Sequence, residues 1–183
     1  MQWCQVVLSI VIDFVEGTWN FDACVVVLRG LPGSGKSTFA DILAAEFRKE
    51  FDLVRERFTR ICAKALYQVG QAREQTHGQA FMQAITDSLA VADVVIVDDT
   101  HIFTKELECV ETTACHLWSK MGLHGKVYTV NFACRDEEHA LMLNHRSWHP
   151  LPNGEIRKLY GSFAELETKV THRPDCFTID PGI

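Results

Sequence analysis

The sequence has no pair of cysteines at the C-x-x-C spacing, although it contains seven cysteines. They are scattered and odd in number, which excludes a zinc-finger or redox-motif signature. We therefore predict buried free thiols in a reducing, intracellular compartment, and a cytoplasmic protein. His145 and His149 lie one helical turn apart, but no carboxylate or cysteine repeats beside them at ligand spacing, so they do not predict a metal site.

Long apolar runs and an excess of basic residues are also missing. The apolar stretch from Val6 to Ile12 is too short to span a membrane and lacks the charged start of a signal peptide, so no membrane partner is expected. We predict an extra strand or a short helix packed on the core, which makes residues 1–23 an N-terminal extension and 24–183 one domain. The net charge of −6 argues against a broad basic face for nonspecific nucleic-acid binding. The sequence leaves the oligomeric state open.

Apolar runs and helical patterns alternate along the chain. Strands are predicted at 25–28, 51–54, 94–97, 126–133 and 177–179. Helices are predicted at 37–47, 71–90, 104–121, 136–143 and 153–170. This alternation favours a three-layer α/β fold with a mainly parallel central sheet, whose ligands bind at the carboxyl ends of the strands.

A glycine-rich turn follows the first strand of this sheet, in the stretch VVVLRGLPGSGKSTFA. Its residues fit the pattern G-x-x-x-x-G-K-[ST], in which glycines let successive N–H groups point inward and a helix begins behind them. Such a nest binds the phosphates of a nucleotide, and the lysine reaches the β- and γ-phosphates. The sequence therefore predicts ATP and Mg²⁺ as cofactors and the following phosphate-binding residues: Gly30, Pro32, Gly33, Ser34, Gly35, Lys36, Ser37 and Thr38.

Two further segments could act on the bound phosphates. Asp98 ends the buried run VVIVDD, where its carboxylate can hold Mg²⁺ together with the Ser37 hydroxyl. The alternative is that Asp98 and Asp99 only terminate a strand or cap a helix. Arg146, in the segment HRSWH, can fold over the phosphates and neutralise the transferring group, or it is a solvated loop arginine.

Taken together, LRGLPGSGKST, VVIVDDTH and RSWHPLPNGEIRKLY resemble the phage-type polynucleotide 5′-hydroxyl kinases and their P-loop relatives, which include zeta-toxin-like kinases. His101 stands where that family usually has asparagine. The resemblance implies a P-loop NTPase fold of the kinase-like type with a helical lid. It also implies transfer of a phosphoryl group from ATP to the 5′ end of RNA or DNA. Arg146 and His149 would then be the lid arginine and histidine.

The chain departs from this family where the proton-accepting aspartate is expected, soon after the second strand. The matching segment reads LVRERFTR and offers Glu56 as the catalytic base, unless Glu56 is an ordinary surface residue. The neighbouring arginines would hold an acceptor phosphate or form a solvated face. The residues assigned to the acceptor or the lid are Arg55, Arg57, Arg60, Asp99 and His149.

Two other functions fit the same residues. One is a kinase for a small metabolite or antibiotic, which the acidic composition favours over a nucleic-acid substrate. The other is a nucleotide-gated regulatory module that has lost its base. Because the sequence has no Asn-Lys-x-Asp motif, it does not favour GTP as the nucleotide.

Overall fold

The fold rests on a five-stranded sheet in which every neighbouring pair of strands is parallel. The computed structural model describes residues 2–16, 21–51, 58–62, 77–98, 104–171, 173 and 175–181. The strand order is β2-β3-β1-β4-β5, with bounds β1 Ala23–Arg29, β2 Phe58–Cys62, β3 Val94–Asp98, β4 Gly125–Phe132 and β5 Cys176–Ile179. The inner strands β1 and β3 are buried along their whole length, as their uninterrupted apolar sequences predict.

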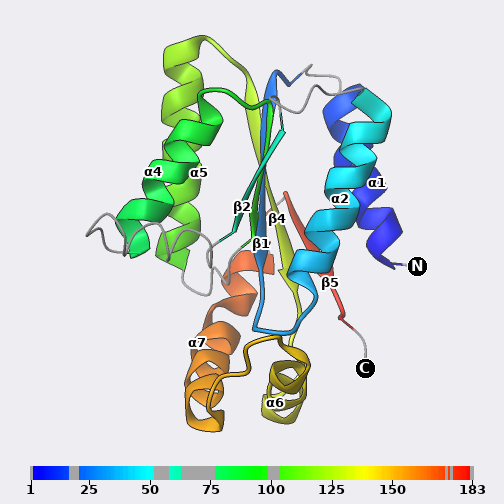
Figure 1. Ribbon diagram of the computed structural model, residues 1–183, viewed down its shortest axis with the longest axis vertical. Helices are drawn as coiled ribbons and strands as arrows, with labels where there is room; N and C mark the ends of the chain where they lie inside the picture. Colours follow the sequence, from blue (N-terminus) through cyan, green and yellow to red (C-terminus); the bar gives the residue numbers. More distant parts are fainter. Residues whose placement is uncertain are drawn as a thin grey trace.

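Helices cover both faces of the sheet, which confirms the predicted three-layer α/β fold (Figure 1). One face carries α1 (Gln2–Glu16) and α2 (Lys36–Phe51), and the other carries α4 (His77–Leu89) and α5 (Thr104–Met121). Two more helices, α6 (Glu137–Arg146) and α7 (Asn153–Thr171), lie beyond the carboxyl edge of the sheet. We call residues 137–171 the lid.

The N-terminal extension is a helix of 15 residues, not a strand. Its buried side chains, Val6, Val7, Ile10 and Val11, pack on the core between α2 and the sheet. Asp13 then accepts hydrogen bonds from Lys126 Nζ at 2.6 Å and from the Tyr128 hydroxyl at 2.7 Å, both on β4. Burial pushes the pKa of Asp13 up, but these two hydrogen bonds outweigh it and the net pKa is below its usual value.

The second strand of the described residues lies further along the chain than we expected. α2 continues to Phe51 and β2 begins at Phe58, whereas we expected the helix to end near Phe47 and a strand at 51–54. No glycine or proline interrupts the sequence from Lys36 to Phe51, so nothing stops the helix earlier. β2 is an edge strand of the described sheet, which is why its sequence FTRIC can carry an arginine and does not stand out as an apolar run. Residues 52–54 lie outside the described part.

The six cysteines whose side chains the structure describes are free thiols, but not all are buried. Cys24 and Cys134 are buried, whereas Cys4, Cys109 and Cys115 are exposed, so the prediction of burial was wrong for these three. Burial raises the pKa of the Cys134 thiol to about 11. Among the helices of the described residues, none combines the length and hydropathy that crossing a bilayer requires.

Candidate nucleotide-binding site

The glycine-rich turn forms a loop between β1 and α2 at the carboxyl edge of the sheet, and we call residues 30–38 the phosphate loop. Gly33 and Gly35 have φ angles of 75° and 95°, a region that residues with a Cβ rarely adopt. α2 begins at Lys36, directly behind them. The loop therefore has the backbone bends and the helix start that a phosphate nest requires.

At Gly30 and at Gly35, neighbouring side chains lie too close to the loop for any residue larger than glycine. A Cβ on Gly30 would lie 2.8 Å from Phe132 Cβ and 2.8 Å from Ser34 Oγ. A Cβ on Gly35 would lie 2.7 Å from the Trp3 ring. α1 therefore packs directly on the phosphate loop through Trp3, a contact that the sequence did not predict.

Lys36 lies within the phosphate loop and is 8 % exposed. Its ammonium group donates hydrogen bonds to the carbonyls of Gly30 and Leu31, both at 2.8 Å, and lies 3.4 Å from Ser34 Oγ. The side chain is thus held inside the curve of the loop. A phosphate bound there would meet a positive charge that is already positioned.

Ser37 and Asp98 meet at the same edge of the sheet. Ser37 is exposed in the first turn of α2. Asp98 is the last residue of β3 and pairs with Leu28 of β1, and Leu28 lies two residues before the phosphate loop. The Asp98 side chain is 5 % exposed. A hydroxyl and a carboxylate are hard oxygen donors of the kind that Mg²⁺ prefers. Within the described ranges, no cluster of three or more His, Cys, Asp or Glu residues could hold a metal ion by itself.

The lid rests on the phosphate loop through α6. Asp136 caps this helix, as predicted, because its Oδ1 accepts a hydrogen bond from His139 N at 2.7 Å. A Cβ on Gly33 would lie 1.8 Å from the Leu143 carbonyl oxygen and 3.2 Å from Ser147 N. The last turn of α6 therefore packs backbone to backbone on the loop. α6 runs to Arg146, so this arginine ends a helix and does not lie in a loop as expected.

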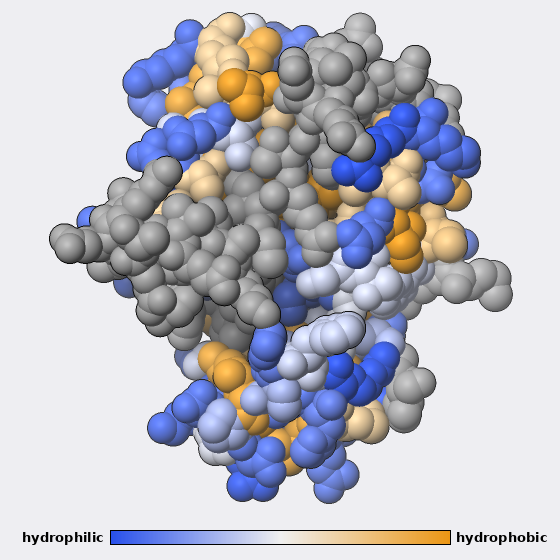
Figure 2. All heavy atoms as spheres, viewed as in Figure 1, coloured by the Kyte–Doolittle hydropathy of each residue, from blue (hydrophilic) through white to orange (hydrophobic). Residues whose placement is uncertain are grey.

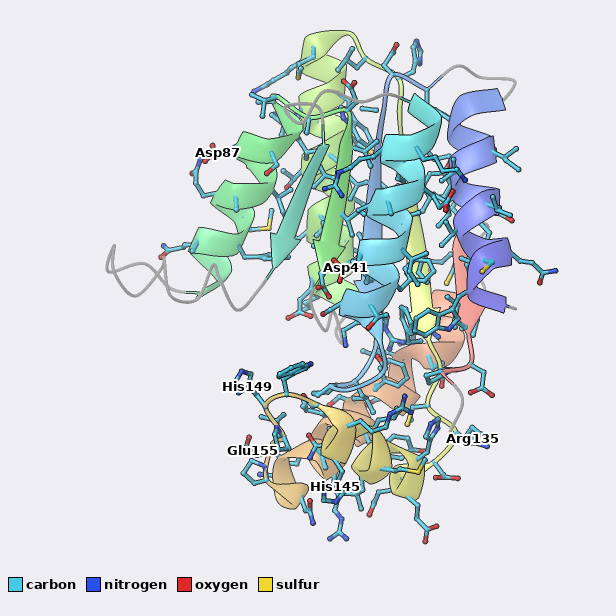
Figure 3. The ribbon with its side chains drawn as sticks, turned by 45° about the vertical axis from the view of Figure 1, so that its right-hand side comes forward. Asp41, Asp87, Arg135, His145, His149 and Glu155 are labelled. Carbon is cyan, nitrogen blue, oxygen red and sulfur yellow. The ribbon has the colours of Figure 1, made fainter. Side chains whose placement is uncertain are left out.

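A cavity of about 520 Å³ lies between the phosphate loop and the lid. Figure 2 shows the hollow between the lid and the body of the molecule, and in Figure 3 the labelled His149 lies on the side of the lid that faces the sheet. The structure thus brings the predicted phosphate-binding lysine and lid arginine to one cavity. Its lining residues are Gly33, Gly35, Lys36, Ser37, Thr38, Arg146, Ser147, Trp148 and His149.

A buried arginine, which the sequence analysis did not single out, connects the base of the phosphate loop to the lid. Arg29, the last residue of β1, is 1 % exposed. Its guanidinium donates to Asn131 Oδ1 at 2.6 Å and to the Phe163 carbonyl at 3.1 Å, and it lies 4.0 Å from the centre of the Phe163 ring. Burial lowers its pKa to about 10, so Arg29 is still charged at neutral pH. α7 is thereby tied to β1 and β4.

Several predicted residues lie outside the described residues, namely Arg55, Glu56, Arg57 and Asp99. Arg60 lies in β2, where it pairs with Ile96 of β3. We expected Glu56 to follow the second strand, whereas β2 begins at Phe58 and Glu56 precedes it in the sequence. In the sequence, the first carboxylate after β2 is Glu74.

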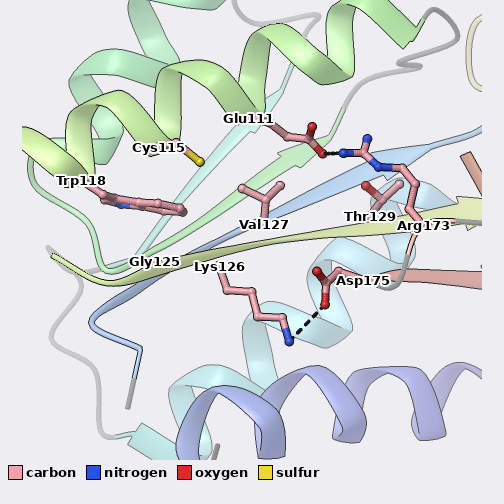
Figure 4. A pocket seen from close by; sticks show the side chains of 9 residues that line it. All are labelled: Glu111, Cys115, Trp118, Gly125, Lys126, Val127, Thr129, Arg173 and Asp175. Atoms are coloured by element: carbon pink, nitrogen blue, oxygen red, sulfur yellow. Dashed lines mark ion pairs between the residues drawn. The ribbon is translucent and has the colours of Figure 1, made fainter. Parts of the chain in front are cut away.

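A second cavity, of about 320 Å³, lies near the opposite end of β4 (Figure 4). Its charged residues already pair with one another, Glu111 with Arg173 and Lys126 with Asp175 at 3.2 Å. Unlike the cavity at the phosphate loop, it presents no backbone nest. We therefore place the functional site at the phosphate loop.

The family model of the chromatin associated protein KTI12 matches residues 24–171 of the chain. The chain belongs to the KTI12 family. The match begins at β1 and ends with α7, so it spans the phosphate loop, Asp98 and the lid. No curated protein sequence matches the chain. The match establishes the KTI12 family, but it does not establish the predicted polynucleotide-kinase branch.

The KTI12-family chain has a kinase-like fold, as its likeness to a solved gluconokinase structure shows. A gluconokinase from Sinorhizobium meliloti 1021 superposes with a TM-score of 0.57 at 16% identity, over 89% of this chain and 85% of that one. A deoxyadenosine kinase from M. mycoides matches with a TM-score of 0.49 at 14% identity, over 87% and 90% of the two chains. A structure of the PezAT toxin-antitoxin system of Streptococcus pneumoniae matches with a TM-score of 0.42 at 14% identity, over 99% of this chain and 79% of that one. At 16% identity, the likeness to the gluconokinase concerns the fold alone.

Proposed function

We propose that this KTI12-family chain transfers the γ-phosphoryl group of ATP to a hydroxyl acceptor, the 5′-hydroxyl of RNA or DNA. The observation that supports this is the shared cavity of the phosphate loop and the lid, which places Lys36 and Arg146 around one space. Phosphoryl transfer depends mainly on positioning and on charges that match the transition state, and in this proposal Lys36 and Arg146 would supply those charges from two sides of the cavity.

In this proposal the loop amides and Lys36 hold the β- and γ-phosphates. Mg²⁺ would be held by the Ser37 hydroxyl and the Asp98 carboxylate, and when bound it would neutralise phosphate charge. Arg146 would stabilise the charge on the transferring group from the lid side. His149, which lines the same cavity, would contact the phosphates from that side as well.

During transfer the acceptor oxygen forms a bond to the γ-phosphorus, and the bond to the oxygen that bridges to the β-phosphate breaks. The acceptor proton must pass to a base. In the proposal this base is a carboxylate, and Glu56 and Glu74 are its two candidates. Asp99, which follows Asp98 in the sequence, is proposed to contact the acceptor. Arg55, Arg57 and Arg60 are given no role here, because β2 begins at the edge of the sheet opposite the phosphate loop.

The experiment is to incubate the protein with Mg²⁺ and γ-labelled ATP, and to offer 5′-hydroxyl RNA and DNA oligonucleotides beside a panel of small hydroxylated molecules. Lys36→Ala is the control. We expect label on the oligonucleotide 5′ end that is lost in the control. Label on a small molecule alone would refute the nucleic-acid acceptor but retain the kinase. Glu56→Gln and Glu74→Gln, assayed in parallel, would identify the base by the loss of transfer with ATP binding intact.

A second candidate is a nucleotide-gated module that binds ATP and hydrolyses it slowly without phosphorylating an acceptor. The observation that favours it is the position of β2, because Glu56 precedes the strand and no carboxylate follows it before Glu74. This candidate predicts ATP binding that depends on Lys36, with label released only as inorganic phosphate.

A further inference from the structure

The side chain of Asn144 hydrogen-bonds to the backbone of Leu151 and so closes the segment 144–151 into a loop. This segment contains Arg146 and lies against the phosphate loop. Asn144 Nδ2 donates a hydrogen bond to the Leu151 carbonyl at 2.8 Å, and Asn144 Oδ1 accepts one from Leu151 N at 2.9 Å. One amide thus satisfies both backbone groups of one residue. Asn144 is 1 % exposed, so each of these hydrogen bonds is shielded from competition by water.

The closed segment has further contacts, both inside it and next to its ends. Ser147 N donates to the Asn144 carbonyl at 3.0 Å, and His149 N lies 3.3 Å from Ser147 Oγ. Leu143, the residue before Asn144, is fully buried together with Ile156 of α7. Leu151 lies between Pro150 and Pro152, whose rings fix φ and restrict the chain there. The segment from 144 to 151 is therefore held at both ends and closed by one side chain.

This closed segment forms the lid wall of the cavity. Arg146, Ser147, Trp148 and His149 line the cavity, and all four lie between Asn144 and Leu151. The backbone also approaches Gly33 of the phosphate loop, at Leu143 and at Ser147. Leu143 directly precedes Asn144 in the sequence, and Ser147 directly follows Arg146. The backbone at Arg146 is thus held by hydrogen bonds within the lid and by the packing of its neighbours on Gly33.

We infer that Asn144 is a positioning residue that pre-organises Arg146 for phosphoryl transfer. The inference rests on the proposed function, because it assigns Arg146 to the transferring group. Asn144 itself lines no part of the cavity and acts only through the segment that it closes. Asparagine is required because the position needs one donor and one acceptor side by side, which aspartate and leucine, of similar size, do not provide.

The test compares Asn144→Asp with Asn153→Asp, the same substitution at an exposed residue of α7. The carboxylate at 144 loses the donor and faces the Leu151 carbonyl. Because a buried acceptor left without its donor shifts an equilibrium by roughly 30-fold, we expect kcat to fall by about that factor with a small change in KM for ATP. Asn153→Asp should match the wild type. In an Arg146→Ala background, Asn144→Asp should have less than about a twofold further effect, since interacting residues are not additive.

A second measurement does not depend on activity. Trypsin cleaves after Arg146, and we expect the Arg146–Ser147 bond of Asn144→Asp to be cut at least tenfold faster than that of Asn153→Asp, without nucleotide. If Asn144→Asp does not fold, Asn144→Ala takes its place, because it removes the hydrogen bonds without adding a charge.

Two outcomes would overturn the inference. Equal cleavage rates in the 144 and 153 variants would show that the amide does not hold the segment. An equal loss of kcat with and without Arg146 would show that Asn144 acts on general stability only. If the wild type neither transfers phosphate nor hydrolyses ATP, the proposed function fails by itself, and the trypsin comparison still decides whether Asn144 closes the segment.

Discussion

Replacing Gly33 by alanine tests whether the lid rests on the phosphate loop in solution. Gly122, which directly follows α5, offers a matched control because its φ of 69° is close to the 75° of Gly33. A Cβ at Gly122 meets nothing within 4 Å, whereas a Cβ at Gly33 would lie 1.8 Å from the Leu143 carbonyl oxygen. The two substitutions therefore share the backbone strain and differ in the steric conflict.

The expected magnitudes follow from these two terms. Forcing a residue with a Cβ into the left-handed region costs roughly 1–2 kcal/mol, and the reduced freedom of the unfolded chain offsets about 0.4–1 kcal/mol of this. Gly122→Ala should thus lower the free energy of unfolding by about 0–1.6 kcal/mol. Gly33→Ala adds an overpacking cost of roughly 1–3 kcal/mol, because a backbone carbonyl must move away.

Urea unfolding followed by circular dichroism gives both free energies, and thermal unfolding should separate the variants by about 2–4 °C for each kcal/mol. Titration with Mg-ADP would show whether the shifted loop still binds phosphate, and we expect weaker binding for Gly33→Ala alone. Equal free energies for the two variants would refute the reasoning, since the lid would then not contact Gly33.

Three further substitutions test the contacts around the site. Arg29→Met should lower the free energy of unfolding by about 1–3 kcal/mol in urea, because its two buried acceptors, one of them the Phe163 carbonyl, lose their donor; an unchanged value would contradict this. Asp13→Asn should remove the stability that Asp13 gains from Lys126, which is present above the unfolded pKa of about 4 and is lost as the pH falls through the lowered folded pKa. The difference between wild type and variant should therefore shrink below about pH 4, and a difference that does not depend on pH would contradict it. Trp3→Ala should weaken Mg-ADP binding, measured by calorimetry, because the loop loses the ring that packs on it.

Local sequence signals predicted most of the helices and strands because each element carries its own boundary residues. α5 begins at Thr104 and ends at Met121, as expected from its apolar stripe and from Gly122. α6 begins after Asp136, whose side chain caps it. β2 was misplaced because an edge strand needs less apolar sequence than an inner strand. The N-terminal helix remained ambiguous with a strand because its short apolar run fits either form.

The site was predictable to the extent that its residues act through a local motif. The phosphate loop is one continuous segment, and its glycine spacing alone predicts its bends. Arg29, Trp3 and Asn144 have no such signal, because each acts through a contact with a different element. A lone asparagine in a helix has the same local sequence whether it closes a buried loop or faces water, so only the fold distinguishes the two.

The register of the sheet constrains where a general base can come from, and so bears on the choice between kinase and regulatory module. Cys62 of β2 pairs with Asp98, which pairs in turn with Leu28 just before the phosphate loop. The end of β2 is therefore at the phosphate edge, and its start at Phe58 pairs with Val94 at the opposite edge. At about 3.3 Å per residue, the two ends of this strand are roughly 13 Å apart, far more than a glutamate side chain can span. A carboxylate that acts on an acceptor at the phosphate edge is therefore expected from a residue that follows Cys62, and this makes Glu74→Gln the more decisive of the two glutamate substitutions.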